Sequence, residues 1–169
     1  AIAPYLENLG FTCRLVDNPV NPRLPFLIGQ RIEDENRPTV LTYGHGDTVL
    51  AMDGRWREGL LPWQVTQEGD RWYGRGTADN KAQHSINIAA LGIVLATRGR
   101  LGFNSTILLE TGEEIGSPGL REFCEQHTAE LKADVEAEKA YYAGFDQPAF
   151  GGVAQREVRN ETVAGAVES

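Results

Sequence analysis

Two short apolar runs on either side of a long amphipathic helix constrain this chain most. Residues 39–44 (TVLTYG) and residues 105–109 (STILL) are rich in β-branched and large apolar side chains, and both run directly into polar loops. Such runs are typical of buried strands whose carboxyl ends carry functional loops. Between them, residues 79–97 have helical spacing, with one apolar face made by Ala82, Ile86, Ala89, Ala90, Ile93 and Val94. The alternation predicts a layered α/β domain with a central, mostly parallel or mixed sheet flanked by helices.

The remaining patterns extend this layout up to about residue 135. Residues 2–9 have helical spacing and end at Gly10, and residues 11–16 and 25–32 alternate as strands around the turn at 17–19. Residues 63–66 and 71–74 flank a turn at 68–70 and predict a hairpin. A helix is expected over 117–131, with Ser117 as N-cap and Pro118 at the first helical position. Residues 136–169 lack apolar periodicity, so we expect an irregular tail after a domain spanning residues 1–135.

Composition excludes several classes of protein. Hydrophobic residues make up 41% and charged residues 24%, which is typical of a globular domain. A formal net charge of -8 disfavours nucleic acid as a partner. No apolar run approaches the ~20 residues that span a bilayer, so no membrane partner is expected. Cys13 and Cys124 are expected to be free thiols, and because no signal peptide is visible we expect a cytoplasmic location.

The first group with catalytic potential is His45-Gly46-Asp47, directly after the strand at 39–44. An imidazole can bind a divalent metal, and a carboxylate two residues later can fix its tautomer through the other ring nitrogen. The same spacing is common in purely structural positions. The triplet alone therefore leaves both interpretations open.

The second group is residues 74–81 (GRGTADNK), which open the predicted long helix. Gly74 and Gly76 allow another group to approach the backbone closely, and Asp79 lies at the start of the helix. Asp79 as a simple helix cap is the alternative, although a cap does not require the glycines.

The third group is Glu113-Glu114, in a turn after the strand at 105–109 and between Gly112 and Gly116. Adjacent carboxylates repel each other. Either both face water, or one binds a cation while the other acts as a base on a metal-activated water. The flanking glycines favour a tight, shaped loop.

Taken in this order, the three groups and the segment 56–79 between them resemble the M20 metallopeptidase family, which includes carboxypeptidase G2-like enzymes, dipeptidases and acetylornithine deacetylases. The resemblance covers about residues 4–135. It implies a zinc-exopeptidase-like fold, a truncated catalytic domain and an absent dimerisation domain. It also implies two divalent metal ions, usually zinc and sometimes cobalt or manganese.

The resemblance also implies a role for each residue. His45 is similar to the histidine ligand of one metal, and Asp47 to the carboxylate that clamps its imidazole. Asp79 resembles the carboxylate that bridges the two metals, and the peptide bond after it, Asp79-Asn80, is expected to be cis.

The two adjacent glutamates receive different roles from the same resemblance. Glu113 is similar to the general base and Glu114 to a ligand of the second metal.

The chain departs from the family pattern after about residue 135. The resemblance requires a further acidic ligand on a strand beginning near residues 133–135, and a histidine beyond it. Glu138 is the nearest acidic residue, and no histidine follows His127. A truncation, an altered reading frame and a divergent relative all remain open as explanations.

We therefore expect a metal-dependent hydrolase of a peptide or N-acyl amino acid amide bond, with a slight preference for dipeptidase and carboxypeptidase-like members. Its partner would be a small peptide or N-acyl amino acid, and the full-length form would be a homodimer. A non-catalytic metal-binding or interaction fragment that retains the hydrolase scaffold is the alternative, because three ligands hold two metals poorly.

Overall fold

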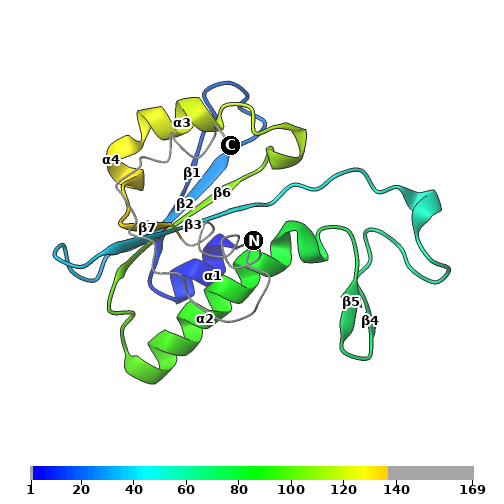
Figure 1. Cartoon of the computed structure of the whole chain (residues 1–169), viewed down its shortest axis with the longest axis horizontal. Helices are drawn as coiled ribbons and strands as arrows, with labels where there is room; N and C mark the ends of the chain where they lie inside the picture. Colours follow the sequence, from blue (N-terminus) through cyan, green and yellow to red (C-terminus); the bar gives the residue numbers. More distant parts are fainter. Residues whose placement is uncertain (1, 137–169) are drawn as a thin grey trace, which may run out of the picture.

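The computed structural model of the chain describes residues 2–136 and has a five-stranded mixed sheet at its centre (Figure 1). The strand order is β1-β2-β6-β3-β7, and the strands are β1 (Thr12–Val16), β2 (Phe26–Arg31), β3 (Thr39–His45), β6 (Asn104–Glu110) and β7 (Val135–Glu136). β1, β2 and β6 are joined by antiparallel pairs, whereas β3 runs parallel to both β6 and β7. The expected mixed α/β sheet is confirmed.

Helices cover both faces of this sheet (Figure 1). α1 (Ala3–Asn8) and α2 (Gln83–Arg98) lie on one face, and α3 (Leu120–Gln126) and α4 (Thr128–Leu131) lie on the other. All seven residues of β6 are buried, and alternate side chains enter the two cores. Ile107 and Leu109 pack with Leu6 of α1 and Ile88 of α2, while Leu108 packs on the opposite face.

The segment between β3 and α2 projects from the layered body (Figure 1). It holds a short 3-10 turn, η1 (Asp53–Arg55), and a separate hairpin made of β4 (Thr66–Glu68) and β5 (Arg71–Tyr73). The hairpin was predicted, but its first strand begins three residues later than expected. A π-helical turn, η2 (Thr77–Ala82), then leads into α2.

The start of the long helix differs from the prediction. Asp79 has extended dihedral angles (φ -107°, ψ 103°), and the Asp79-Asn80 bond is cis, as the family resemblance implied. Regular α-helix therefore begins at Gln83 rather than at Asp79. No side-chain capping bond is made at the start of η2 or α2, so Asp79 is not a helix cap.

The predicted apolar face of this helix is wrong. Ile86 and Ile93 are 67% and 65% exposed, whereas His84 and Ile88 are buried and Leu91 packs against the core. The helix carries a second stripe at positions 84, 88 and 91, and this stripe is the one that faces the sheet. His84 was expected to be either a surface or a core residue, and it is a core residue.

The helix predicted over 117–131 is broken into α3 and α4. Gly119, not Ser117, is the N-cap of α3, and Gly119 has a φ of 88°. Ser117 makes no capping bond and directs its hydroxyl to Glu110 instead. A 3-10 turn, η3 (Glu113–Ile115), precedes this region.

The other expectations divide between tested and untested regions. Cys13 and Cys124 are not joined by a disulfide, as expected. Within the described residues, every helix is too short or too polar to cross a lipid bilayer. β7 begins where the resemblance placed a further strand, whereas Glu138 and the predicted irregular tail lie outside the described residues.

Candidate functional site

The site is built on two neighbouring strand ends. β3 and β6 run parallel, with His45 in register with Glu110, so the residues that follow each strand leave the sheet at the same edge. The amide of Gly46 donates to the carbonyl of Glu110 at 2.8 Å, which continues the pairing by one residue. Side chains that immediately follow these strands therefore meet at the carboxyl edge of the sheet.

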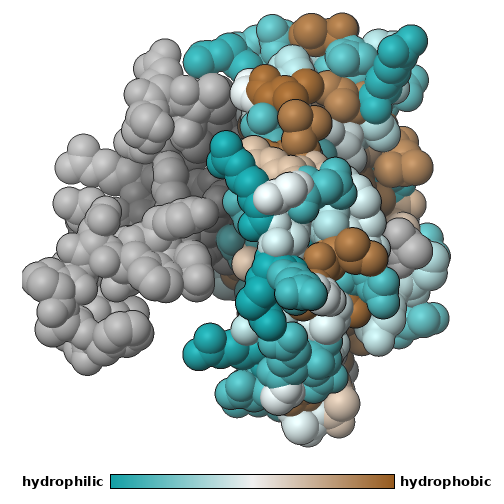
Figure 2. Space-filling view, turned by 90° about the vertical axis from the view of Figure 1, so that its right-hand side faces the viewer, coloured by the Kyte–Doolittle hydropathy of each residue, from teal (hydrophilic) through white to brown (hydrophobic). Residues whose placement is uncertain are grey.

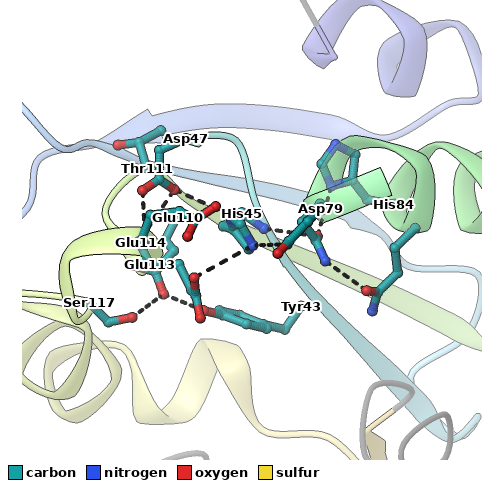
Figure 3. A network of polar contacts seen from close by, with 12 residues as sticks. Tyr43, His45, Asp47, Asp79, His84, Glu110, Thr111, Glu113, Glu114 and Ser117 are labelled. Carbon is teal, nitrogen blue, oxygen red and sulfur yellow. Dashed lines mark hydrogen bonds and ion pairs between the residues drawn. The ribbon is translucent and has the colours of Figure 1, made fainter. Parts of the chain in front are cut away.

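His45 lies at the centre of this edge and is only 4% exposed (Figure 3). Its Nδ1 atom is 3.3 Å from Asp47 Oδ1. Its Nε2 atom is 3.0 Å from Asp79 Oδ1 and 3.7 Å from Glu113 Oε2. One ring nitrogen thus faces the orienting carboxylate, and the other faces the open side of the site.

Asp47 contacts more than the imidazole. Its Oδ1 atom accepts from the backbone amide of Glu113 at 3.3 Å, and its Oδ2 atom accepts from the amide of Glu114 at 3.0 Å. A single carboxylate therefore links the loop after β3 to the turn after β6. This contact fixes the position of η3 relative to His45.

Asn80 supports the same edge from the side of α2. Its Oδ1 atom accepts from the backbone amide of His45 at 3.3 Å and lies 3.4 Å from Nδ1 of His84. Gly44 permits this approach, because a Cβ there would lie 2.9 Å from Asn80 Oδ1 and 3.1 Å from His84 Nδ1. Burial lowers the pKa of His84, and electrostatic interactions with Lys81 and His45 act in the same direction.

The structure brings three of the predicted residues into one group. Ligand atoms of His45, Glu113 and Glu114 all lie within 4.8 Å of one another. Asp79 is outside that group but contacts His45 directly, and its side chain is 76% exposed. All five predicted site residues therefore lie at one edge, with Asp79 on its solvent side.

The donor set suits a divalent cation. If Nδ1 of neutral His45 carries the proton toward Asp47, then Nε2 presents a lone pair toward the carboxylate oxygens of Asp79 and Glu113. Three acceptors facing one another repel unless a proton or a cation lies between them. Within residues 2–136, His45 is the only basic side chain paired with these carboxylates. Imidazole nitrogen and carboxylate oxygen are ligands that Zn²⁺, Co²⁺ and Mn²⁺ accept.

Sequence reasoning missed Glu110, which it assigned to the polar turn at 110–116. The residue ends β6 and is 2% exposed. Burial raises the pKa of its carboxyl, and the negative charges of Asp47 and Glu113 add to this, while hydrogen bonds from Tyr43 and Ser117 oppose it. A charged residue that continues an uninterrupted apolar run was the available signal.

The molecule is an α/β domain with a mixed sheet covered by helices on both faces, and a candidate metal site of histidine and carboxylates lies at the carboxyl edge of the sheet. Residues 41–154 match the family described as Peptidase family M20/M25/M40. The chain belongs to this family.

Individual relatives agree with this assignment. The chain is 34% identical to the Beta-Ala-His dipeptidase of Mus musculus over 110 residues, which is 64% of this chain and 22% of that protein. It is 31% identical to the Cysteinylglycine-S-conjugate dipeptidase of Corynebacterium striatum over 137 residues, which is 79% of this chain and 29% of that protein. The chain therefore spans between 22% and 29% of the length of these relatives.

A solved structure shows the same fold. The crystal structure of an M20 family metallo-carboxypeptidase from Sulfolobus solfataricus matches with a TM-score of 0.69 and 30% sequence identity. The match covers 79% of this chain and 29% of that one. The zinc-exopeptidase-like α/β fold expected from the sequence is confirmed.

Proposed function

We propose that this chain forms part of a metal-dependent hydrolase that cleaves a peptide or N-acyl amino acid amide bond. The observation that carries the proposal is the environment of His45 Nε2, which faces Asp79 Oδ1 at 3.0 Å and Glu113 Oε2 at 3.7 Å. A proton on Nε2 or a cation between these atoms would relieve their repulsion, and family membership favours a divalent metal.

Three residues are proposed as ligands. His45 would be a ligand of one metal, Glu114 a ligand of the second, and Asp79 would be a ligand common to both. Zinc is the expected ion, with cobalt or manganese as alternatives. When bound, such a pair acidifies the attacking water and polarises the amide carbonyl.

The remaining residues orient groups and move the proton. Asp47 holds the Nδ1 side of His45, so that Nε2 stays free to bind. Glu113 has a side chain that is 44% exposed, so water and substrate reach its carboxylate. Glu113 takes a proton from the attacking water and delivers it to the amine that leaves.

Small substrates fit this proposal best. The two relatives described above are named as dipeptidases, and the solved structure is named as a carboxypeptidase, which favours short peptides over N-acyl amino acids. A homodimeric full-length form and a cytoplasmic location stay predictions.

The test compares Glu113→Gln with Glu114→Gln in the full-length protein. Metal content after dialysis and turnover of a dipeptide panel are measured under the same conditions. Glu113→Gln should keep its metal and lose at least ~100-fold in turnover, the usual scale for a general base. Glu114→Gln should lose metal from one site. Glu125→Gln, an exposed acid on α3, is the matched control and should change neither quantity.

Three other outcomes are informative. If Glu113→Gln sheds metal while Glu114→Gln retains it, the two roles are reversed. If both variants keep full activity, the proposed mechanism is wrong. Metal binding without turnover in the parent protein would favour the non-catalytic metal-binding alternative.

A further inference from the structure

Glu110 is a buried carboxyl that the proposed chemistry does not use. It ends β6, where every residue is buried, and its hydrogen-bond partners in the described part of the chain are hydroxyl groups. Burying a carboxyl is costly unless hydrogen bonds compensate for the lost water. A buried carboxyl such as Glu110 therefore needs hydrogen-bond donors that offset the cost of its burial.

Two hydroxyl groups supply that compensation, and both reach the same oxygen. The phenol of Tyr43 donates to Glu110 Oε1, and the hydroxyl of Ser117 donates to this atom at 2.8 Å. Figure 3 shows these three residues directly beside the group formed by His45, Glu113 and Glu114. The carboxyl is thus shared between two separate parts of the chain.

Tyr43 and Ser117 each lie close in sequence to residues of the candidate site. Tyr43 lies two residues before His45 on β3. Ser117 follows η3, the turn that carries Glu113 and Glu114. Glu110 therefore connects the strand of the histidine to the far end of the turn of the glutamates.

The turn has two attachments, one at each end. At its start, Asp47 accepts from the amides of Glu113 and Glu114. At its end, Ser117 bonds back to the carbonyl of Gly112 at 2.8 Å and donates its hydroxyl to Glu110. Ser117 has a φ of 51°, in the left-handed region that a serine adopts only when its surroundings require it.

We propose that Glu110 is a positioning residue, which fixes the turn of Glu113 and Glu114 against the strand of His45 through Ser117 and Tyr43. It is buried, so it does not touch substrate and is not a catalytic residue. An apolar side chain of similar size would pack in its place but would remove the oxygen that the hydroxyls of Tyr43 and Ser117 share. The consequence for metal binding rests on the proposed function, whereas the consequence for the turn does not.

The first measurement is amide hydrogen exchange in the metal-free 169-residue chain. Glu110→Gln keeps an oxygen acceptor, while Glu110→Leu removes it. Exchange across residues 112–117 should rise about tenfold in Glu110→Leu and stay within about threefold of the parent in Glu110→Gln. Thr106→Val is the matched control, since Thr106 is buried on the same face of β6, four residues earlier.

Unchanged exchange in Glu110→Leu would overturn the proposal. So would an equal rise in Thr106→Val, because the effect would then be general loosening of the strand. If Glu110→Leu fails to fold, Ser117→Ala removes one of the two bonds and keeps the carboxyl. It should raise exchange in the same residues, and unchanged exchange there would count against the proposal.

The second measurement is the affinity for Co²⁺, followed by its absorption spectrum. Glu110→Leu should bind about 10- to 100-fold more weakly than the parent, the range for residues that orient ligands, and Glu110→Gln should stay near the parent. If the parent chain itself does not bind Co²⁺, the proposed function fails, while the exchange data still decide the positioning role. If the parent and Glu110→Leu bind equally tightly and exchange alike, only the positioning role fails.

Discussion

Two segments leave the carboxyl edge of the sheet, and they differ in how they are held. The turn after β6, residues 111–117, is short and is attached at both ends, through Asp47 and through Glu110. The segment after β3, residues 48–76, is long and projects from the body (Figure 1). Its hairpin, β4–β5, forms a sheet of its own.

The long segment also exposes large apolar side chains, which are Leu50, Met52, Leu61, Trp63, Val65 and Trp72. Figure 2 views the molecule from the side on which the segment projects, and hydrophobic residues are visible on this side. Contacts within the segment include Trp56, whose Nε1 atom donates to the carbonyl of Ala51 at 2.7 Å, and Arg75, whose guanidinium lies 5.4 Å from the centroid of the Trp56 ring.

This difference divides the candidate site into two halves. His45, Asp47, Glu113 and Glu114 are fixed by the sheet and the short turn. Asp79 comes at the end of the long segment and is largely exposed. The sheet half is therefore the more firmly held of the two, and four predictions test this contrast.

The largest effect is expected for His45→Ala, which removes the imidazole at the centre of the rigid half. Affinity for Zn²⁺ or Co²⁺ should fall by more than ~100-fold, beyond the range for residues that only orient ligands. Isothermal titration measures the change. His127→Ala is the control, because His127 bonds Glu130 on the far side of α3. Equal binding by His45→Ala and the parent would show that the imidazole is not a ligand.

The next prediction compares two glycines, one in each region. Gly44→Ala should lower the free energy of unfolding by about 1–3 kcal/mol, because its Cβ would lie 2.9 Å from Asn80 Oδ1 and 3.1 Å from Leu109 Cδ2. Gly54→Ala in η1 meets no atom within 4 Å and should change stability by less than about 1 kcal/mol. Urea unfolding of both variants gives the values. Similar losses at both positions would contradict the contrast between the regions.

A smaller effect, in rate, is expected from proteolysis by a glutamate-specific protease. Glu58 and Glu68 lie in the long segment, and Glu113 and Glu114 lie in the short turn. Cleavage in the segment should be about tenfold faster or more, since exposed loops are cut before segments held by tertiary contacts. Mass spectrometry of early products measures the order. Early cleavage at Glu113 would show that the turn is the looser of the two.

The same contrast explains what the sequence could predict of the fold. The ends of β3 and β6 were predicted to within one residue, because a strand buried between two helical layers has an unbroken apolar sequence. The face of α2 was wrong, because the helix has two apolar stripes and periodicity does not say which one meets the sheet. The break before α3 depends on Asn18, whose Nδ2 atom donates to the carbonyl of Pro118 at 2.8 Å, a contact far apart in sequence.

The candidate site divides in a similar way. Residues that directly follow a strand, such as His45 and Glu113, could be found from local patterns and family resemblance. The pairing of Glu110 with Tyr43 could not be found in this way, because it depends on the register of β3 against β6. Asn80 was also missed, since its contact with the His45 amide requires the extended backbone at Asp79.

The smallest effect is expected at the joint between the two regions, where His84 packs under Gly44. Burial lowers the pKa of His84 below its ordinary value of 6.5, so the folded state favours the neutral ring. The unfolded chain then takes up the proton first as the pH falls, and stability that is fully present above about pH 6.5 is lost progressively below it. The carboxyls whose pKa values are lowered, such as Glu33 and Glu130, lose their contributions only below about 4.5. Glu110, whose pKa is raised by burial, is present in both the parent and the His84 variant, so the difference between the two proteins from about pH 5 to 6.5 reports on His84. Urea unfolding across this window should give a steeper loss of free energy for the parent than for His84→Gln, by at most about 1.4 kcal/mol per pH unit.

His127→Gln serves as the comparison for histidine loss elsewhere. Parallel pH profiles for the parent and His84→Gln would mean that the ring under Gly44 is protonated as readily in the fold as in the unfolded chain.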